Sequence, residues 1–315
     1  MRFRHTRLLA VIAAACLVTA PIAVTASASA ASPPLSDARE VAHFDINAQQ
    51  QPENITLLPG GAADVTFNRS REVAQVSTDG SVTILATLPA PATGTATASG
   101  IVRAPDGSIY VNYNAGSQSG IWRIPPGGGT PVQVVALPDV KVLNGLALDI
   151  GEDALYATDS SAGTVWKVSL STGTASLWAE GTDLEPNTAN SSGLGANGIK
   201  VHDGAVWVSN TDKGTLLSIA IGPHGTAGAV TTKATGLTAV DDFAFTGDGD
   251  QVVAALDFVN EVALVQSDGS HQIVLTAADG TENPTSIAVR GSTVYVASGA
   301  YFTHLDPNLL LAKLG

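Results

Sequence analysis

Cysteine is almost missing from this chain of 315 residues: Cys16, near the N-terminus, is the only one. Disulfide bonds and thiolate chemistry are therefore excluded for the rest of the chain. Basic residues are also few, 15 against 28 acidic ones, which gives a formal net charge of −13. A surface of that sign repels phosphate backbones, so we expect no nucleic-acid binding.

Common motifs of catalysis and nucleotide binding are missing as well. The chain has no GxSxG nucleophile elbow and no GxxxxGK phosphate loop. Residues 193–198, GLGANG, match GxGxxG, but they precede an expected strand and lie in no βαβ unit. The histidines are scattered without the spacing of zinc ligands. Neither a dinucleotide site nor a zinc site is expected.

Long apolar runs are confined to the N-terminus. Three arginines precede an apolar run over residues 8–24, and Ala-X-Ala patterns follow up to Ala30. This order is typical of a secretory signal peptide, so we predict that residues 1–30 are removed and that the mature protein is secreted and free of the membrane. A lipid anchor on Cys16 is the alternative. Removal of the three arginines leaves 12 basic against 28 acidic residues, a net charge of −16.

A phrase of strand, turn and strand recurs six times in the remaining chain, which shows no sustained helical period. One position recurs at the start of the first strand of each repeat, with spacings of 46, 45, 53, 44 and 44 residues. We name these six the slot residues: Glu53, Ser99, Asn144, Asn197, Asp241 and Thr285. Such a period, with about four strands per unit, is typical of β-propellers. Residues 31–315 are thus predicted to form one all-β domain, a six-bladed β-propeller of four-stranded antiparallel blades.

The last repeat is short of an outer strand. Residues 40–46, EVAHFDI, alternate like a strand, so we predict that this N-terminal strand completes the last blade and closes the ring. Residues 309–314, LLLAKL, are the alternative. The long irregular stretch 182–195 precedes the strand that carries Asn197; it is either the rim or lid of a pocket or a tolerated surface insertion.

The slot residues should converge on the central channel, because the first strand of each blade lines it. Asn144 and Asn197 each precede glycine, and either alone could be a turn residue. Glu53 and Asp241 precede apolar strands, where a carboxylate is costly unless it is paired or coordinated. Four oxygen donors without His or Cys favour a divalent metal, Ca²⁺ above all. Ser99 and Thr285 are then predicted to line the substrate pocket.

The loops between the second and third strands should lie on the same face as the slot residues. We therefore predict that the mouth of the pocket is surrounded by Asn68, Arg69, Tyr113, Asn114, Ser160, Asn210, Asp257 and Phe258. Tyr301, Phe302 and His304 follow the second strand of the last blade and could reach the pocket, with a structural role as the alternative for His304. From these sets Ser99, Tyr113, Asn210, Asp257, Thr285 and Tyr301 are the predicted substrate-binding residues. A mixed polar and aromatic lining suits a small molecule, and it suits a protein-binding face equally well.

With this set in this blade order, the mature chain resembles the gluconolactonase and regucalcin family of six-bladed propellers and the related diisopropylfluorophosphatase group. The resemblance implies that Glu53, Asn144, Asn197 and Asp241 hold a divalent metal. Two positions depart from the family pattern: Asp241 is followed by Asp242, and Glu53 by Asn54, where the family commonly has glycine. The phrases ENI, NGIK and DDF also resemble a branch of propellers that includes fungal biosynthetic proteins.

The resemblance implies a metal-dependent hydrolase that acts on a lactone or ester of a small molecule. The signal peptide predicts that it is exported, and we expect a monomer. The metal would polarise the carbonyl, and Asp241 or Asp242 would orient or deprotonate water as the catalytic carboxylate. Asp242 is also an alternative metal ligand. Because one fold hosts many activities, two alternatives stay open: a non-catalytic secreted propeller that binds a ligand or protein, and a lyase or cyclisation catalyst.

Overall fold

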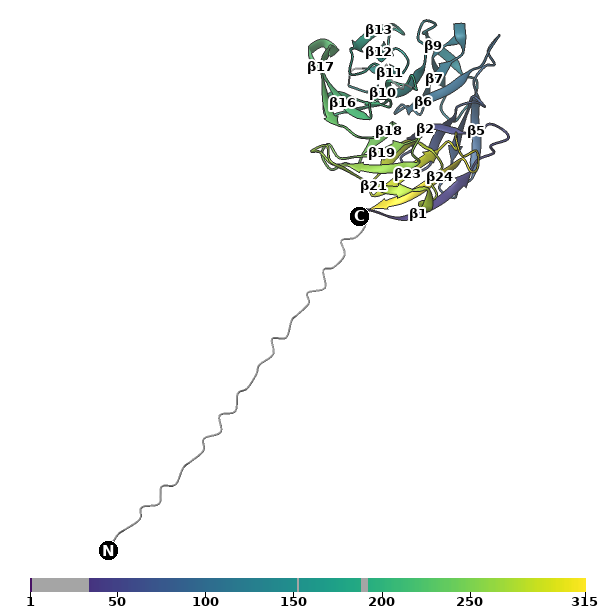
Figure 1. Cartoon of the computed structure of the whole chain (residues 1–315). Coiled ribbons are helices and arrows are strands. Elements are labelled where there is room, and N and C mark those ends of the chain that lie inside the picture. Colours follow the sequence, from purple (N-terminus) through teal and green to yellow (C-terminus); the bar gives the residue numbers. More distant parts are fainter. Residues whose placement is uncertain (2–33, 152, 188–191) are drawn as a thin grey trace. The chain divides into compact units, whose positions relative to one another are not determined.

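The described strands form several sheets (Figure 1). Within each sheet neighbouring strands follow one another in sequence order, except in the sheet that contains both the first and the last strand of the chain. The computed structural model describes Met1 and residues 34–151, 153–187 and 192–315. The predicted signal peptide therefore lies outside the described residues, apart from Met1. Pro33–Gly315 make up one unit, in which the described residues form six four-stranded antiparallel sheets. None of the described helices is long and apolar enough to cross a membrane.

The six sheets are the predicted blades, and in each the first strand lies innermost. Blades 1 to 3 consist of β2 (Pro52–Leu57), β3 (Ala63–Phe67), β4 (Glu72–Val76) and β5 (Val82–Thr87); β6 (Thr97–Arg103), β7 (Ile109–Asn114), β8 (Gly120–Ile124) and β9 (Val132–Ala136); and β10 (Leu143–Asp149), β11 (Ala154–Asp159), β12 (Thr164–Ser169) and β13 (Ala175–Glu180). Blades 4 to 6 consist of β14 (Ala196–His202), β15 (Ala205–Asn210), β16 (Thr215–Ile221) and β17 (Ala227–Ala234); β18 (Val240–Phe245), β19 (Val252–Leu256), β20 (Glu261–Val265) and β21 (His271–Thr276); and β22 (Pro284–Arg290), β23 (Thr293–Ser298), β24 (Asn308–Leu314) and β1 (Leu35–His43). The only helices among the described residues are short 3-10 turns, Gly116–Gln118, Pro223–Gly225 and Ala277–Asp279.

The N-terminal strand closes the ring, as predicted. β1 pairs antiparallel with β24 and is the outer strand of blade 6, so no edge of β24 is left open. The alternative, in which residues 309–314 take the outer position, is wrong, because β24 is the third strand. β1 also begins earlier than residue 40: Leu35 is buried in the core between blades 5 and 6 and pairs with Leu314.

The apolar core is divided among the interfaces between neighbouring blades. The cluster around Ile101 and Val73, for example, joins blades 1 and 2, and the cluster around Phe67 and Leu309 joins blades 6 and 1. The other four clusters bridge the remaining pairs of neighbours. A single four-stranded sheet exposes two apolar faces, so each blade is stabilised by the two blades beside it. The same packing holds the inner strands around the central channel.

Candidate functional site

A β-bulge occurs at every slot position. The pairing of each inner strand with its neighbour shifts register at the slot residue: between Leu143 and Leu146, for example, which flank Asn144, and between Val240 and Phe243, which flank Asp241. The other four inner strands shift at the same place. A bulge leaves its residue out of the ladder and re-aims the side chain. The recurrence of the slot position in the sequence therefore reflects a β-bulge at the start of each inner strand.

Four of the six slot residues share one cavity of about 530 Å³: Glu53, Asn144, Asn197 and Asp241. Its wall also contains Asn68, Arg69, Asp257, Phe258, Tyr301, Phe302 and His304, all named from the sequence as candidates for the mouth. Ser192 and Leu194, from the described end of the irregular stretch 182–195, complete one side. The loops that line the cavity thus belong mainly to blades 1, 5 and 6.

The structure places four of the predicted substrate-binding residues outside this cavity, because their polar groups are used between blades or loops. The Ser99 hydroxyl donates to the Leu143 carbonyl at 2.8 Å, and the Thr285 hydroxyl donates to the Pro52 carbonyl at 3.1 Å. The Tyr113 ring is buried in the core of blades 1 and 2, and its hydroxyl donates to the Pro89 carbonyl. The Asn210 amide donates to the carbonyls of Asp183 and Glu185.

Two other predicted mouth residues are used in the same way. The Asn114 amide donates to the Leu143 carbonyl at 2.9 Å, and the Ser160 hydroxyl donates to the Ala196 carbonyl at 2.8 Å. Both bonds cross to the first strand of the next blade. The predicted mouth residues of blades 2, 3 and 4 therefore bind neighbouring blades and loops instead of lining the cavity, although Thr211 of the blade 4 loop does lie on the cavity wall.

The residue that follows each slot residue divides the blades into two groups. Blades 2, 3 and 4 have Gly100, Gly145 and Gly198 there. A Cβ atom on Gly145 would lie 2.4 Å from the Asn197 carbonyl oxygen, and one on Gly198 would lie 2.5 Å from Asp242 Oδ1. Glycine is thus needed where the inner strand of the next blade approaches so closely.

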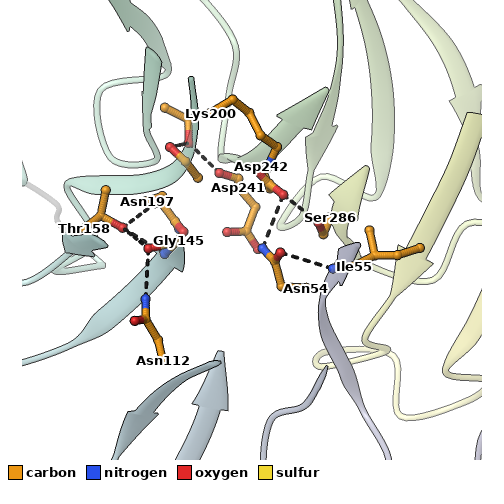
Figure 2. A network of polar contacts seen from close by, with 12 residues as sticks. Asn54, Ile55, Asn112, Gly145, Thr158, Asn197, Lys200, Asp241, Asp242 and Ser286 are labelled. Atoms are coloured by element: carbon orange, nitrogen blue, oxygen red, sulfur yellow. Dashed lines mark hydrogen bonds and ion pairs between the residues drawn. The ribbon is translucent and has the colours of Figure 1, made fainter. Parts of the chain in front are cut away.

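Blades 5, 6 and 1 have Asp242, Ser286 and Asn54 at this position instead, and the Asp242 carboxylate binds the other two side chains (Figure 2). Asp242 Oδ2 accepts from Ser286 Oγ at 2.5 Å and from Asn54 Nδ2 at 3.3 Å. Asp242 Oδ1 accepts from Lys200 Nζ of blade 4 at 2.6 Å. We name these four residues the Asp242 network. Asp242 is 1% exposed and is not part of the cavity wall.

The Asp242 network replaces a second kind of contact between blades, which is present only in blades 1 to 4. In blades 1 to 4 a polar side chain on the second strand donates to the backbone carbonyl of the next blade's slot residue: Thr66 to Ser99, Asn112 to Asn144, Thr158 to Asn197 and Ser209 to Asp241. Blades 5 and 6 have Ala255 and Ala297 on this strand, which cannot donate. The network instead joins blades 4, 5, 6 and 1 through one carboxylate.

Three carboxylates line the cavity wall, and burial is the main cause of the shift in each of their pKa values. Burial, opposed by the Tyr301 hydrogen bond and aided by the charge of Asp242, raises the pKa of Glu53 to about 7. Burial and then the charge of Glu53 raise the pKa of Asp257 to about 8. Burial, followed by the charges of Glu53, Asp257 and Asp242, holds the pKa of Asp241 well above its usual range. Mutual repulsion of this kind is relieved by a bound cation.

Two buried oxygens in the cavity have no hydrogen-bond partner, and one of them belongs to a candidate metal ligand. The Asn197 amide donates through Nδ2 to Thr211 Oγ1 at 2.8 Å, which leaves the buried Oδ1 of Asn197 without a partner. Oδ1 of Asp257 is likewise buried and unpartnered. Buried acceptors are costly when unsatisfied, and hard oxygen donors suit Ca²⁺. The amide and carboxylate donors therefore fit a divalent ion of this kind, with Glu53, Asn144, Asn197 and Asp241 as the residues that would hold it.

Acidic and imidazole groups also gather away from the centre. Among the described residues, two groups bring three such ligand atoms within 4.8 Å of one another: Glu40, His43 and Asp306, and His202, Asp203 and Asp250. Neither group lies in the cavity. The three carboxylates of the cavity do not form such a group, so an ion there would depend on the amide oxygens as much as on the acids.

Sequence reasoning did not identify three residues that shape the site. Thr211 orients the Asn197 amide, Lys200 neutralises Asp242, and Asn283 holds two loops of the mouth. Thr211 follows Asn210 at the end of a strand, and Lys200 lies in the NGIK phrase. Neither spacing nor composition predicts these pairs, because each joins residues from different turns or blades.

The fold and the cavity together define a six-bladed β-propeller with an acidic, amide-lined cavity at one end of its channel. No protein-family profile matches the sequence, and no functionally curated protein matches it. Solved structures match over most of their length. Regucalcin from Agrobacterium tumefaciens, a calcium-binding protein, superposes with a TM-score of 0.65 at 15% identity, over 88% of this chain and 93% of its own.

Proteins with different activities share this architecture. A protein assigned as a gluconolactonase superposes with a TM-score of 0.65 at 15% identity, over 88% of this chain and 92% of its own. Virginiamycin B lyase from Staphylococcus aureus, solved as a catalytically inactive His-to-Ala variant with quinupristin, gives a TM-score of 0.59 at 16% identity, over 89% of this chain and 99% of its own. At these identities the likeness extends to the fold alone.

Proposed function

We propose that the protein is an exported, monomeric, metal-dependent hydrolase that opens a lactone or ester of a small molecule. The carrying observation is the convergence of Glu53, Asn144, Asn197 and Asp241 on one cavity with a buried, unpartnered amide oxygen. A divalent cation held by these four residues, Ca²⁺ by preference, would polarise the substrate carbonyl. The calcium-binding regucalcin and the gluconolactonase-like structure with the same fold support this choice.

The remaining cavity residues supply the other parts of the reaction. Asp257 has a free buried oxygen and is not one of the four candidate ligands, so it is the carboxylate placed to accept a proton from the attacking water. Tyr301 donates to Glu53 and fixes the direction of that carboxylate. Asp242, a sequence candidate for this task, already accepts three hydrogen bonds inside the Asp242 network.

The test is lactone hydrolysis with and without Ca²⁺. We expect turnover to require Ca²⁺, and we expect Ca²⁺ to raise the melting temperature. Glu53→Ala and Asp241→Ala should lose both the turnover and this rise. Asp257→Asn should keep the Ca²⁺-dependent melting shift and lower kcat by about 100-fold or more, the usual contribution of a general base. A protein that melts identically with Ca²⁺ and with chelator, and that turns over nothing, is a binding propeller instead.

A lyase is the second candidate, and His304 is the observation that favours it. His304 lies on the cavity wall, and virginiamycin B lyase with a histidine replaced is inactive on the same fold. Reaction in ¹⁸O-labelled water separates the two activities. Hydrolysis places one labelled oxygen in the acid product, whereas elimination places none.

A further inference from the structure

Two phenylalanines are exposed at the rim of the cavity. Phe258, between β19 and β20, is 43% exposed, and Phe302, between β23 and β24, is 60% exposed. Their ring centroids lie 5.2 Å apart with an interplanar angle of 85°, an edge-to-face pair. No other phenylalanine is exposed in the described part of the chain. Large exposed aromatic side chains beside a polar cavity are typical of a binding surface.

A buried amide fixes the position of this pair. Asn283, 3% exposed, accepts through Oδ1 from the backbone N–H groups of Phe302 at 3.0 Å and Thr303 at 3.2 Å. Its Nδ2 donates to the carbonyl of Asp257, the neighbour of Phe258, at 3.3 Å. One side chain therefore holds both segments that carry the rings. The rim is built in advance of any ligand, which lowers the entropy cost of binding.

Each ring is one residue away from the floor of the cavity. Phe258 follows Asp257, and Phe302 follows Tyr301, whose hydroxyl donates to Glu53. Consecutive Cα atoms are about 3.8 Å apart, so a single small molecule can touch a ring and a floor carboxylate together. The carboxylates of Asp241 and Asp257 are buried, and the wall adds the apolar side chains of Ile46 and Leu194 beside the exposed polar residues Gln49, Arg69, Ser192 and His304.

We propose, resting on the proposed function, that the substrate class is a neutral lactone or ester that carries an aryl group. The aryl group packs against Phe258 and Phe302 while the carbonyl reaches the floor. An anion is disfavoured by the three floor carboxylates and by the chain's net charge of −13, and Arg69 is the one Lys or Arg in the described wall.

The test uses matched ligands that differ only in the aryl ring. Binding of 3,4-dihydroquinolin-2-one and of δ-valerolactam, which are stable cyclic amides, is measured by calorimetry in saturating Ca²⁺. We expect the aryl lactam to bind about tenfold more tightly, from aromatic contact and burial of the ring. Phe258→Ala and Phe302→Ala should each remove most of this preference, because they weaken binding of the aryl lactam far more than binding of valerolactam. Ile150→Ala, an exposed apolar residue outside this cavity, is the control and should retain it.

Hydrolysis of the matching lactones, dihydrocoumarin and δ-valerolactone, separates this proposal from the proposed function. Equal affinity for both lactams, or a preference that survives in both Phe variants, overturns the aryl class even if both lactones are hydrolysed. Aryl preference in binding without hydrolysis of either lactone keeps the aryl class and overturns the hydrolase. If neither lactam binds, the proposal is wrong. If the Phe variants then also lose self-association or protein capture, the rim is a protein interface.

Discussion

At the scale of single residues, Asp242 is the position where the sequence and the structure differ most. Its place beside Asp241 predicted a metal ligand or a catalytic carboxylate. The structure directs its side chain into a network with Lys200, Ser286 and Asn54 (Figure 2), and Asp242 is not part of the cavity wall. The departure from glycine after the slot residues of blades 1 and 5 thus has a structural reason.

We expect Asp242→Asn to destabilise the protein without removing its metal response. Loss of one partner from a buried ion pair costs about 3–5 kcal/mol, and less here because Lys200 is 26% exposed and can turn toward water. With about 2–4 °C per kcal/mol, the melting temperature should fall by roughly 5–10 °C. Scanning calorimetry with and without Ca²⁺ measures both quantities.

A matched control is Asp106→Asn, whose ion pair with Arg123 lies 3.6 Å apart on the surface. Exposed pairs contribute little, so its melting temperature should stay within about 1–2 °C of the parent. The opposite result, an Asp242→Asn variant that melts normally but no longer responds to Ca²⁺, would make Asp242 a metal ligand.

At the scale of elements, the strand that closes the ring should control stability more than its exposed position suggests. β1 covers the edge of β24 and adds Leu35 and Ala42 to the cores on both sides of blade 6. A chain that begins at Phe44 leaves that edge unpaired, which invites pairing between molecules.

We expect the chain that begins at Phe44 to lose about 3 kcal/mol or more of unfolding free energy and to self-associate. A chain that begins at Pro34 is the control and should behave as the parent. Urea titration and size-exclusion chromatography at two protein concentrations measure the change. An unchanged urea midpoint with a monomeric profile would show that β1 is dispensable.

The elements themselves could be predicted because the repeat is written in the sequence. Alternation, turn dipeptides and a period near 45 residues predict the blades, and the slot residues follow from their common phase at the bulge. The loops were less predictable. Asn114 and Ser160 occupy the same position in their blades as Asn68 does in blade 1, but they bind the next inner strand and Asn68 lines the cavity. That choice depends on distances between blades, which no single repeat encodes.

At the scale of the whole molecule, the acidic centre predicts how stability depends on pH. The folded-state pKa of Glu53 is about 7 and that of Asp257 about 8, above the values near 4 that carboxyl groups have in an unfolded chain. Between these values the folded protein binds more protons than the unfolded one. The free energy of unfolding of the metal-free protein therefore falls as pH rises through this range, by up to about 1.4 kcal/mol per pH unit for each carboxyl.

We expect the metal-free protein to show a urea midpoint that decreases from pH 5 to pH 8, and millimolar Ca²⁺ to flatten that decrease and restore stability most strongly at pH 8. The ion binds the ionised folded state, and an excess of about 100 times Kd contributes about 2.7 kcal/mol. Glu53→Gln removes one of the repelling charges and one candidate ligand, so its midpoint should vary less with pH and should not respond to Ca²⁺. A midpoint that rises between pH 5 and pH 8 without metal would contradict the sign, because it requires carboxylates stabilised by partners in the fold. Since the three carboxylates share one cavity, that result would remove the electrostatic reason for a cation at its centre.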